Sequence, residues 1–268
     1  MDDSNTIRER ALTASAEELS AMVHHPDGEV LRAILQNPAF NEAHLLLLLE
    51  RKDLSGEILE EVARRRFLLK NYRIKRAIVF HSQVPRLVCL RLLRDLYLMD
   101  LVQFTLSVSA KAELKIKAEE QLLARLPQLP LGQKVTLARR GPGRLAATLL
   151  AEGHPRILEV VLDNPYLNEG HLLKALSHEK LPEAVIVAVA RHRRWSVFYN
   201  VRIAIVRHPR SPLAVVLGFL PHITLGDLRE LVAPGLLADS LRNYLQAEIA
   251  RRLAPPSSKP IPESPSQT

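Results

Sequence analysis

Apolar residues recur along most of this chain at spacings of three and four positions, which is the pattern of a helix that buries one face. Val30, Leu31 and Ile34 are an example, and Asn37-Pro38 ends that helix because the residue before a proline is pushed out of the α region. Prolines and capping residues divide the pattern into short segments. We therefore predict helices of roughly 10 to 12 residues near 42–51, 55–66, 71–80 and 85–94, and again near 169–177, 182–192, 198–207 and 212–220.

The second group of helices repeats the first. A shift that places position 37 on position 164, and position 93 on position 220, aligns the two stretches without a gap and yields 22 identical pairs. The offset of this internal duplication is therefore 164 − 37 = 127 positions. A weaker period of 44 positions lies inside each copy and relates Asn-Pro turns to turns of the His-Pro type. Self-similarity of this kind is typical of repeat proteins, in which each unit packs only on its neighbours.

These patterns predict an all-α fold. Its expected parts are a flexible N-terminus at 1–14, a single α-solenoid at 15–254 with duplicated halves at about 28–94 and 155–220 and a diverged middle at 95–154, and a disordered tail at 255–268. The tail is expected to be disordered because it is rich in proline and serine and poor in apolar residues. Within the solenoid, Thr224 with Asp227 is expected to cap a short helix, and a last helix from about 237 to 253 closes the array.

Several residues mark the helix starts and the expected core. Asn41 and Asn168 are expected to cap the helices that follow them, and Pro85, Pro182 and Pro212 to occupy first helical positions, which need no amide hydrogen. Apolar residues at equivalent positions of the two copies should all be buried: Leu45, Leu49, Val62, Ile78 and Leu90 with Leu172, Leu176, Val189, Ile205 and Leu217.

The composition indicates an aliphatic core and an uneven distribution of charge along the chain. The chain is 47% hydrophobic but only 4% aromatic, and its net charge is +8. Residues 1–62 hold 13 acidic and 5 basic side chains, net −8, which leaves 16 acidic and 32 basic side chains, net +16, for the remainder. The single cysteine, Cys89, lies in an apolar segment and is expected to be a core residue in a reducing cytoplasm. Apolar runs such as Leu45–Leu49 fall far short of the roughly 20 residues that span a bilayer, so neither membrane insertion nor a signal peptide is expected.

Basic residues gather at corresponding places in the two copies, where one helix ends and the next begins. The hypothetical binding residues of this basic edge are Arg64, Arg65, Arg66, Lys70, Arg73, Lys75 and Arg76 in the first copy, and Arg191, Arg193, Arg194, Trp195 and Arg202 in the second. With Tyr72 and Tyr199 nearby, such an edge could follow a phosphate backbone while a ring stacks on a base. The alternative is that arginine and lysine favour helix C-termini and only keep an exposed edge hydrated.

No motif for catalysis or for metal binding is found. His44, His81, His171 and His208 form repeat-related pairs, which indicates structural positions in turns and helix starts. The chain has no paired-cysteine site, and no serine lies in a Gly-x-Ser-x-Gly motif. Gly141-Pro142-Gly143-Arg144 lacks the lysine and hydroxyl residue of a phosphate loop and is expected to be a turn. We therefore predict no catalytic residue, no metal and no cofactor.

The segments Ala-Ile-Leu-Gln-Asn-Pro at 33–38 and Val-Val-Leu-Asp-Asn-Pro at 160–165 are each followed by Asn-Glu and a leucine-rich helix. They resemble the leucine-rich repeat variant and HEAT-like repeats of bacterial proteins, over about 28–94 and 155–220. The resemblance implies a right-handed α-solenoid of short stacked helices that acts as a binding scaffold without catalytic residues. The chain is also similar, in its basic charge, helices and length, to the alkylpurine DNA glycosylases of the HEAT-like group.

The function we expect is a non-enzymatic interaction scaffold that presents its basic edge to an acidic protein or to a nucleic acid. The alternative is a nucleic-acid repair enzyme of the glycosylase type. A carboxylate in a concave groove within reach of Trp195, Tyr199 or Tyr72 would favour the enzyme, and a leucine-filled interior with only an outer charged edge would favour the scaffold. The sequence leaves the oligomeric state and the identity of the partner open.

Overall fold

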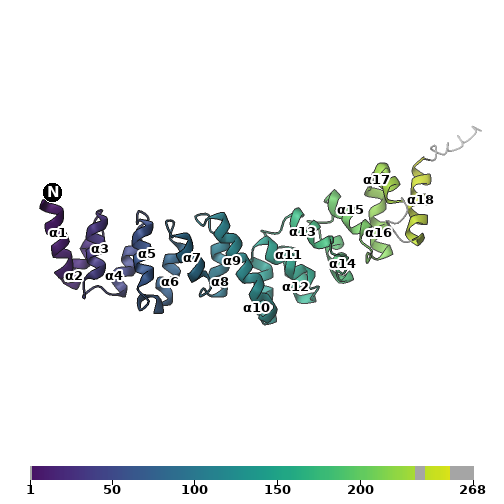
Figure 1. Ribbon diagram of the computed structural model, residues 1–268. Coiled ribbons are helices and arrows are strands. Elements are labelled where there is room, and N and C mark those ends of the chain that lie inside the picture. The colour runs from purple at the N-terminus through teal and green to yellow at the C-terminus, as the bar shows by residue number, and fades with distance from the viewer. Residues whose placement is uncertain (1, 233–238, 254–268) are drawn as a thin grey trace, which may run out of the picture. The chain divides into compact units, whose positions relative to one another are not determined.

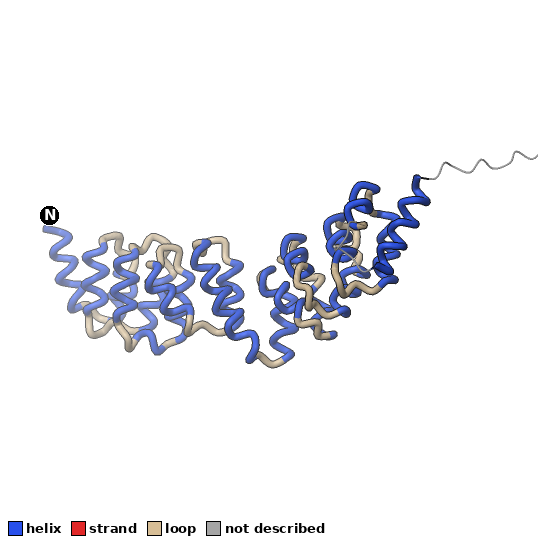
Figure 2. The backbone as a smooth tube through the Cα atoms, turned by 45° about the vertical axis from the view of Figure 1, so that its right-hand side comes forward, coloured by secondary structure: helices blue, strands red, loops and turns tan. Residues whose placement is uncertain are grey.

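The computed structural model describes residues 2–232 and 239–253. Helices, including three short 3-10 helices, hold 71% of these residues, and no strand occurs among them (Figures 1 and 2). The predicted all-helical fold is thereby confirmed. No helix in the described ranges is both long enough and apolar enough to cross a membrane. The expected disordered tail at 255–268 lies outside the described residues.

The chain divides into two compact units, residues 1–133 with 140–145 and residues 134–139 with 146–268. The first unit holds α1 (Asp2–Thr13), α2 (Ala16–Met22), α3 (Gly28–Gln36), α4 (Glu42–Leu49), α5 (Gly56–Arg64), η1 (Leu68–Lys70), α6 (Tyr72–Phe80), α7 (Arg86–Leu93), α8 (Leu98–Leu106), α9 (Ala112–Arg125) and η2 (Leu126–Gln128). The division falls within α10 (Leu131–Arg140) and α11 (Gly143–Ala151). A single array over 15–254 stays a prediction.

The second unit continues with α12 (Pro155–Val161), α13 (Glu169–Leu176), α14 (Glu183–Arg191), α15 (Tyr199–Arg207), α16 (Leu213–Phe219), η3 (Leu220–His222), α17 (Leu225–Leu231) and α18 (Asp239–Leu253). The bounds of α4 to α7 and of α13 to α16 agree with the predicted helices to within two residues. Helices α13, α14 and α15 have the same lengths as α4, α5 and α6 and begin and end at the positions that the predicted offset assigns to them. The helical units were thus predictable from local signals, and the duplication itself stays a prediction.

Residues 2–13, within the segment expected to be flexible, form helix α1, which packs on α3. The flexibility itself stays a prediction. Ala11 and Ala14 are buried. The side-chain nitrogen of buried Asn37 donates hydrogen bonds to the carbonyl oxygens of Ala11, at 2.9 Å, and Ala14, at 3.0 Å. The sequence signal was weak because a small alanine, and not a leucine, lies in this contact.

Three helix starts follow the predicted capping chemistry. The side chain of Asn41 accepts hydrogen bonds from the backbone nitrogens of Ala43 and His44, and Asn168 accepts one from His171. Thr224 accepts from the backbone nitrogen of Asp227 and caps α17 as predicted. Helices α7, α14 and α16 begin one residue later than predicted, so Pro85, Pro182 and Pro212 are their N-cap residues and not their first helical residues.

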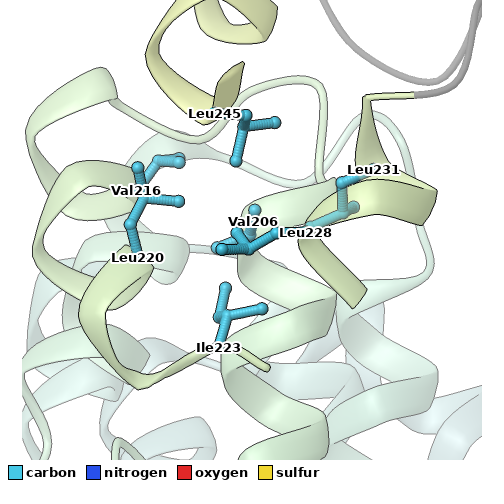
Figure 3. Close-up of a cluster of buried hydrophobic side chains, with 7 residues drawn as sticks. All are labelled: Val206, Val216, Leu220, Ile223, Leu228, Leu231 and Leu245. Atoms are coloured by element: carbon cyan, nitrogen blue, oxygen red, sulfur yellow. The ribbon is translucent and has the colours of Figure 1, made fainter. Parts of the chain in front are cut away.

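The two units are filled by aliphatic side chains. Eight of the ten predicted core residues are buried, and Leu90 and Leu217 are partly exposed. Figure 3 shows a cluster at the end of the second unit, in which side chains from α15, α16, η3, the turn after it, α17 and α18 converge: Val206, Val216, Leu220, Ile223, Leu228, Leu231 and Leu245. Leu217 and Leu241 pack against this cluster from partly buried positions.

Side chains that reach back about 30 residues hold successive helices together. His81 contacts the carbonyl oxygen of Arg51 at 2.6 Å through Nε2, and His208 contacts that of His178 at 3.1 Å. Arginines use the same kind of acceptor, since Arg51 donates to the carbonyl oxygens of Val23 and His25 at 2.7 Å each. A helix end leaves carbonyl groups without partners, and these side chains satisfy them. We call them carbonyl-capping side chains.

Replacing Asn37 by alanine is expected to lower the free energy of unfolding by roughly 1 to 3 kcal/mol, because two carbonyl groups lose their donor in a buried place. Hydrogen exchange measured by mass spectrometry should show faster exchange across α1. Asn37→Asp keeps the acceptor that binds the backbone nitrogen of Ala39 at 2.7 Å but removes both donors. If Asn37→Asp were as stable as the unmodified protein, the bonds to Ala11 and Ala14 would not hold α1.

Candidate functional site

The first basic cluster lies where α5 ends and the chain passes through η1 into α6. Two residues of this turn point inward: Leu68 is buried, and the guanidinium of Arg65 donates to the carbonyl oxygen of Leu35 at the end of α3. Arg65 also lies 3.4 Å from the carboxylate of Glu61. Arg65 is therefore a carbonyl-capping side chain and is not available to a partner.

Two further basic residues of this cluster are held by acidic neighbours. The Lys75 ammonium lies 2.6 Å from the carboxylate of Asp95. Arg76 is held by Asp100, at 2.7 Å from Nε, and by the side-chain oxygen of Gln103 at 2.9 Å. Both side chains join α6 to residues that follow α7, so their charges are neutralised within the first unit.

Four basic side chains of the first cluster remain on the exposed side: Arg64, Arg66, Lys70 and Arg73. Within the described ranges, the side chains of Arg66, Lys70 and Arg73 form neither a hydrogen bond nor an ion pair. Arg64 lies 3.6 Å from Glu60 with 77% of its side chain exposed, and an ion pair so exposed contributes little. These four charges face solvent and can meet an anionic partner.

The second cluster follows α14, and it too contains basic residues that bind within the protein and basic residues that are exposed. Arg194 donates to the carbonyl oxygens of Asn164, at 3.3 Å, and Leu167, at 3.1 Å, and Arg202 donates to that of Ser196 at 2.6 Å. Arg191 and Arg193 are exposed, and no described residue pairs with their side chains. Both line an open hollow of about 550 Å³ together with Asp163, His192 and Arg194. This hollow is dominated by positive charge.

The structure corrects the role expected for Trp195. Its side chain is only 1% exposed, and its indole nitrogen donates to the carbonyl oxygen of Leu162 at 2.8 Å. The guanidinium of Arg194 lies 4.3 Å from the centre of its ring. A ring covered in this way cannot stack on a base, so Trp195 does not belong to the binding surface.

The hydroxyl groups of Tyr72 and Tyr199 also have hydrogen-bond partners within the protein. The Tyr72 hydroxyl donates to the carboxylate of Asp100 and accepts from the backbone nitrogen of Tyr97 at 3.0 Å. The Tyr199 hydroxyl donates to Asp227 and accepts from the backbone nitrogen of Thr224 at 3.1 Å. Burial, and then the bond to Asp100, raises the pKa of Tyr72, so this phenol stays protonated as a donor.

The cysteine and several histidines, which could in principle act in catalysis or metal binding, have structural roles. Burial raises the pKa of the Cys89 thiol to about 12, which leaves almost no thiolate at neutral pH. His44, His81 and His208 bind backbone groups through both ring nitrogens, as expected for structural positions, whereas the buried Nδ1 of His171 has no hydrogen-bond partner. In the described part of the chain, no group of three or more histidine, cysteine or acidic residues could hold a metal ion.

The sequence analysis did not include Phe67, an exposed ring within the first basic cluster. Phe67 follows Arg66 directly, precedes η1 and is 62% exposed. A signal was present in the sequence, because the predicted duplication makes Arg194, a charged residue, the equivalent of Phe67. A position that one copy fills with arginine is not a core position, and the phenylalanine could have been placed on the surface for that reason.

Comparison of the chain with protein-family models, with curated proteins and with solved structures finds no match.

Proposed function

We propose that this protein is a non-enzymatic interaction scaffold, built as a duplicated α-solenoid, that binds an acidic partner through two exposed arginine pairs. We define the arginine pairs as Arg64 with Arg66 and Arg191 with Arg193. The partner is a nucleic acid or an acidic protein surface. We place the protein in the cytoplasm, because its single cysteine is a buried free thiol.

The observation that supports this function is the recurrence of the arginine pairs. They occupy equivalent positions of the two copies, each beginning at the last residue of a helix, α5 or α14. In each pair the residue between the two arginines has a partner within the protein: Arg65 binds the carbonyl oxygen of Leu35, and His192 lies 3.2 Å from the carboxylate of Asp163, which is itself exposed. The same two positions are therefore exposed and positive in both units.

Exposed like charges at neighbouring positions do not stabilise a fold, since they repel each other and gain nothing from burial. A polyanion removes this repulsion and releases its own counterions when it binds. Five other basic residues of the expected edge, Arg65, Lys75, Arg76, Arg194 and Arg202, have partners inside the protein and are left out of the proposed surface. Lys70 and Arg73 are exposed and add positive charge beside the first pair.

The enzyme alternative required a carboxylate beside the aromatic residues. Asp100 lies beside Tyr72 and Asp227 beside Tyr199. Both carboxylates are already engaged, Asp100 by Arg76 and Asp227 by its own helix cap, Thr224. Bonds from Thr224 and then Tyr199 lower the pKa of Asp227. The Tyr72–Asp100 and Tyr199–Asp227 pairs each join two helices of one unit. Because they serve as structural contacts, we prefer the scaffold to the enzyme.

The test is a variant in which Arg64, Arg66, Arg191 and Arg193 are all changed to glutamine. Its affinity for a labelled oligonucleotide at low salt is expected to fall. If all four contact phosphates, the slope of log affinity against log salt should become shallower by roughly 3, at about 0.7 for each contact on a single strand. Thermal unfolding should be unchanged, because exposed charges contribute little to stability.

The matched control removes four exposed basic residues that lie outside both clusters, Lys52, Arg94, Lys174 and Lys180, again by glutamine. It changes the net charge by the same amount and should retain most of the affinity. Polyglutamate serves as the acidic-protein probe in the same assay. Equal losses in both variants would show that net charge alone attracts the anion, and no binding of either probe at low salt would refute the proposed function.

A further inference from the structure

The turn between α5 and α6 has an inward side and an outward side. Arg65 and Leu68, three positions apart, face the interior. Backbone bonds from Leu68 to Arg65, at 3.0 Å, and from Lys70 to Phe67, at 3.3 Å, keep the turn tight. The outward positions are therefore Arg64, Arg66, Phe67 and Lys70, and each of these residues is exposed. The outward side thus consists of one aromatic ring with basic side chains before and after it.

We propose that this turn binds single-stranded nucleic acid, with the Phe67 ring stacked on a base and with Arg64, Arg66 and Lys70 contacting phosphates. The inference rests on the proposed function and names one of its two classes of partner. It replaces Trp195, which is buried, by Phe67 as the stacking residue.

The chemistry of the outward side favours a single strand over the other polyanions. An acidic protein surface offers carboxylates to the arginines, but it does not pair each anionic group with a flat ring face. A duplex offers phosphates, but its bases are stacked inside. A single strand presents a base face and a phosphate in every nucleotide, which matches a ring flanked by cations. Phe67 is 62% exposed, so most of its surface is in water and can be covered by a base.

The second unit lacks this ring. At the position equivalent to Phe67 it has Arg194, whose guanidinium lies over Trp195 and donates to two carbonyl oxygens. The pair Arg191 and Arg193 is nevertheless exposed there. We therefore assign phosphate contacts to both units and base stacking at this turn to the first unit alone.

The experiment measures fluorescence anisotropy with a labelled oligo(dT) single strand and with a duplex of equal length. Phe67→Ala should lower the affinity for the single strand by roughly 5- to 150-fold, the range found for loss of one stacked base, and should leave the affinity for the duplex unchanged. Phe67→Trp should keep the affinity for the single strand. Tyr244→Ala, which removes an exposed ring from α18, should change neither affinity.

The outcomes separate this inference from the proposed function. Suppose that Phe67→Ala lowers the affinities for single strand and duplex equally, or lowers neither, while the arginine variant still lowers both. The stacking role is then wrong and the scaffold function stands. If polyglutamate binds and oligonucleotides do not, the partner is an acidic protein and the inference fails. If neither probe binds, both proposals fail. Circular dichroism should show an unchanged melting temperature for Phe67→Ala, because the ring is exposed.

Discussion

Replacing Trp195 by alanine is expected to lower the free energy of unfolding by roughly 3 to 5 kcal/mol, the range for truncating a buried aromatic side chain. The change also removes the donor for the carbonyl oxygen of Leu162 and the ring on which the Arg194 guanidinium lies. Thermal and urea unfolding followed by circular dichroism would measure the loss. A stacking tryptophan on the surface would behave in the opposite way, with weaker nucleic-acid binding and unchanged stability.

Trp195→Phe provides the control for this prediction. It keeps much of the buried volume and loses the indole N–H, so its expected cost is smaller, roughly 1 to 3 kcal/mol for the carbonyl group left without a donor. Equal stability of the alanine variant and the unmodified protein would contradict the burial of Trp195 and would restore it as a candidate for base stacking.

Leu172→Ala is expected to cost roughly 2 to 5 kcal/mol, because the leucine is fully buried in α13 and its loss leaves a cavity. Trp195 is the only tryptophan of the chain and lies in the same unit, so its fluorescence reports the unfolding of that unit. The urea midpoint of the fluorescence transition should fall while its slope stays the same.

The same chemical change at an exposed position tests whether burial is the cause. Leu213 lies at the start of α16 and is 42% exposed, so Leu213→Ala should lower the midpoint much less than Leu172→Ala. If the two variants unfold at the same urea concentration, the predicted buried face of α13 is wrong.

The helix bounds could be predicted because their signals are local. Asn41, Asn168 and Thr224 cap the helices that begin one residue later, and the spacing of leucines and valines shows which face is buried. A side chain and its first few neighbours carry all of this information. The boundary errors of one or two residues, such as the prolines at N-cap positions, are of the size expected for frayed helix ends.

The candidate site could not be predicted as well, because its residues find their partners in other helices. Arg65 and Arg66 are neighbours with the same side chain, yet one binds a carbonyl group of α3 and the other faces solvent. Trp195 lies among arginines in the turn between α14 and α15, and its buried indole donates to the carbonyl oxygen of Leu162, 33 positions earlier. Neither difference is visible in a short stretch of sequence. The equivalence of Phe67 and Arg194 was visible, and it required a comparison of the two copies.

The carbonyl-capping side chains have a consequence for how the protein is made. Arg51 donates to Val23 and His25, Arg125 to Arg94 and Leu96, and Arg210 to Lys180 and Leu181, so every acceptor precedes its donor in the chain. On a ribosome the acceptors leave the exit tunnel first, and each bond can close once about 30 further residues have been synthesised. Such short separations favour rapid folding, because little chain entropy is lost when each loop closes. The nascent protein can therefore fold helix by helix from its N-terminal side, as each of these arginines bonds to the segments synthesised just before it.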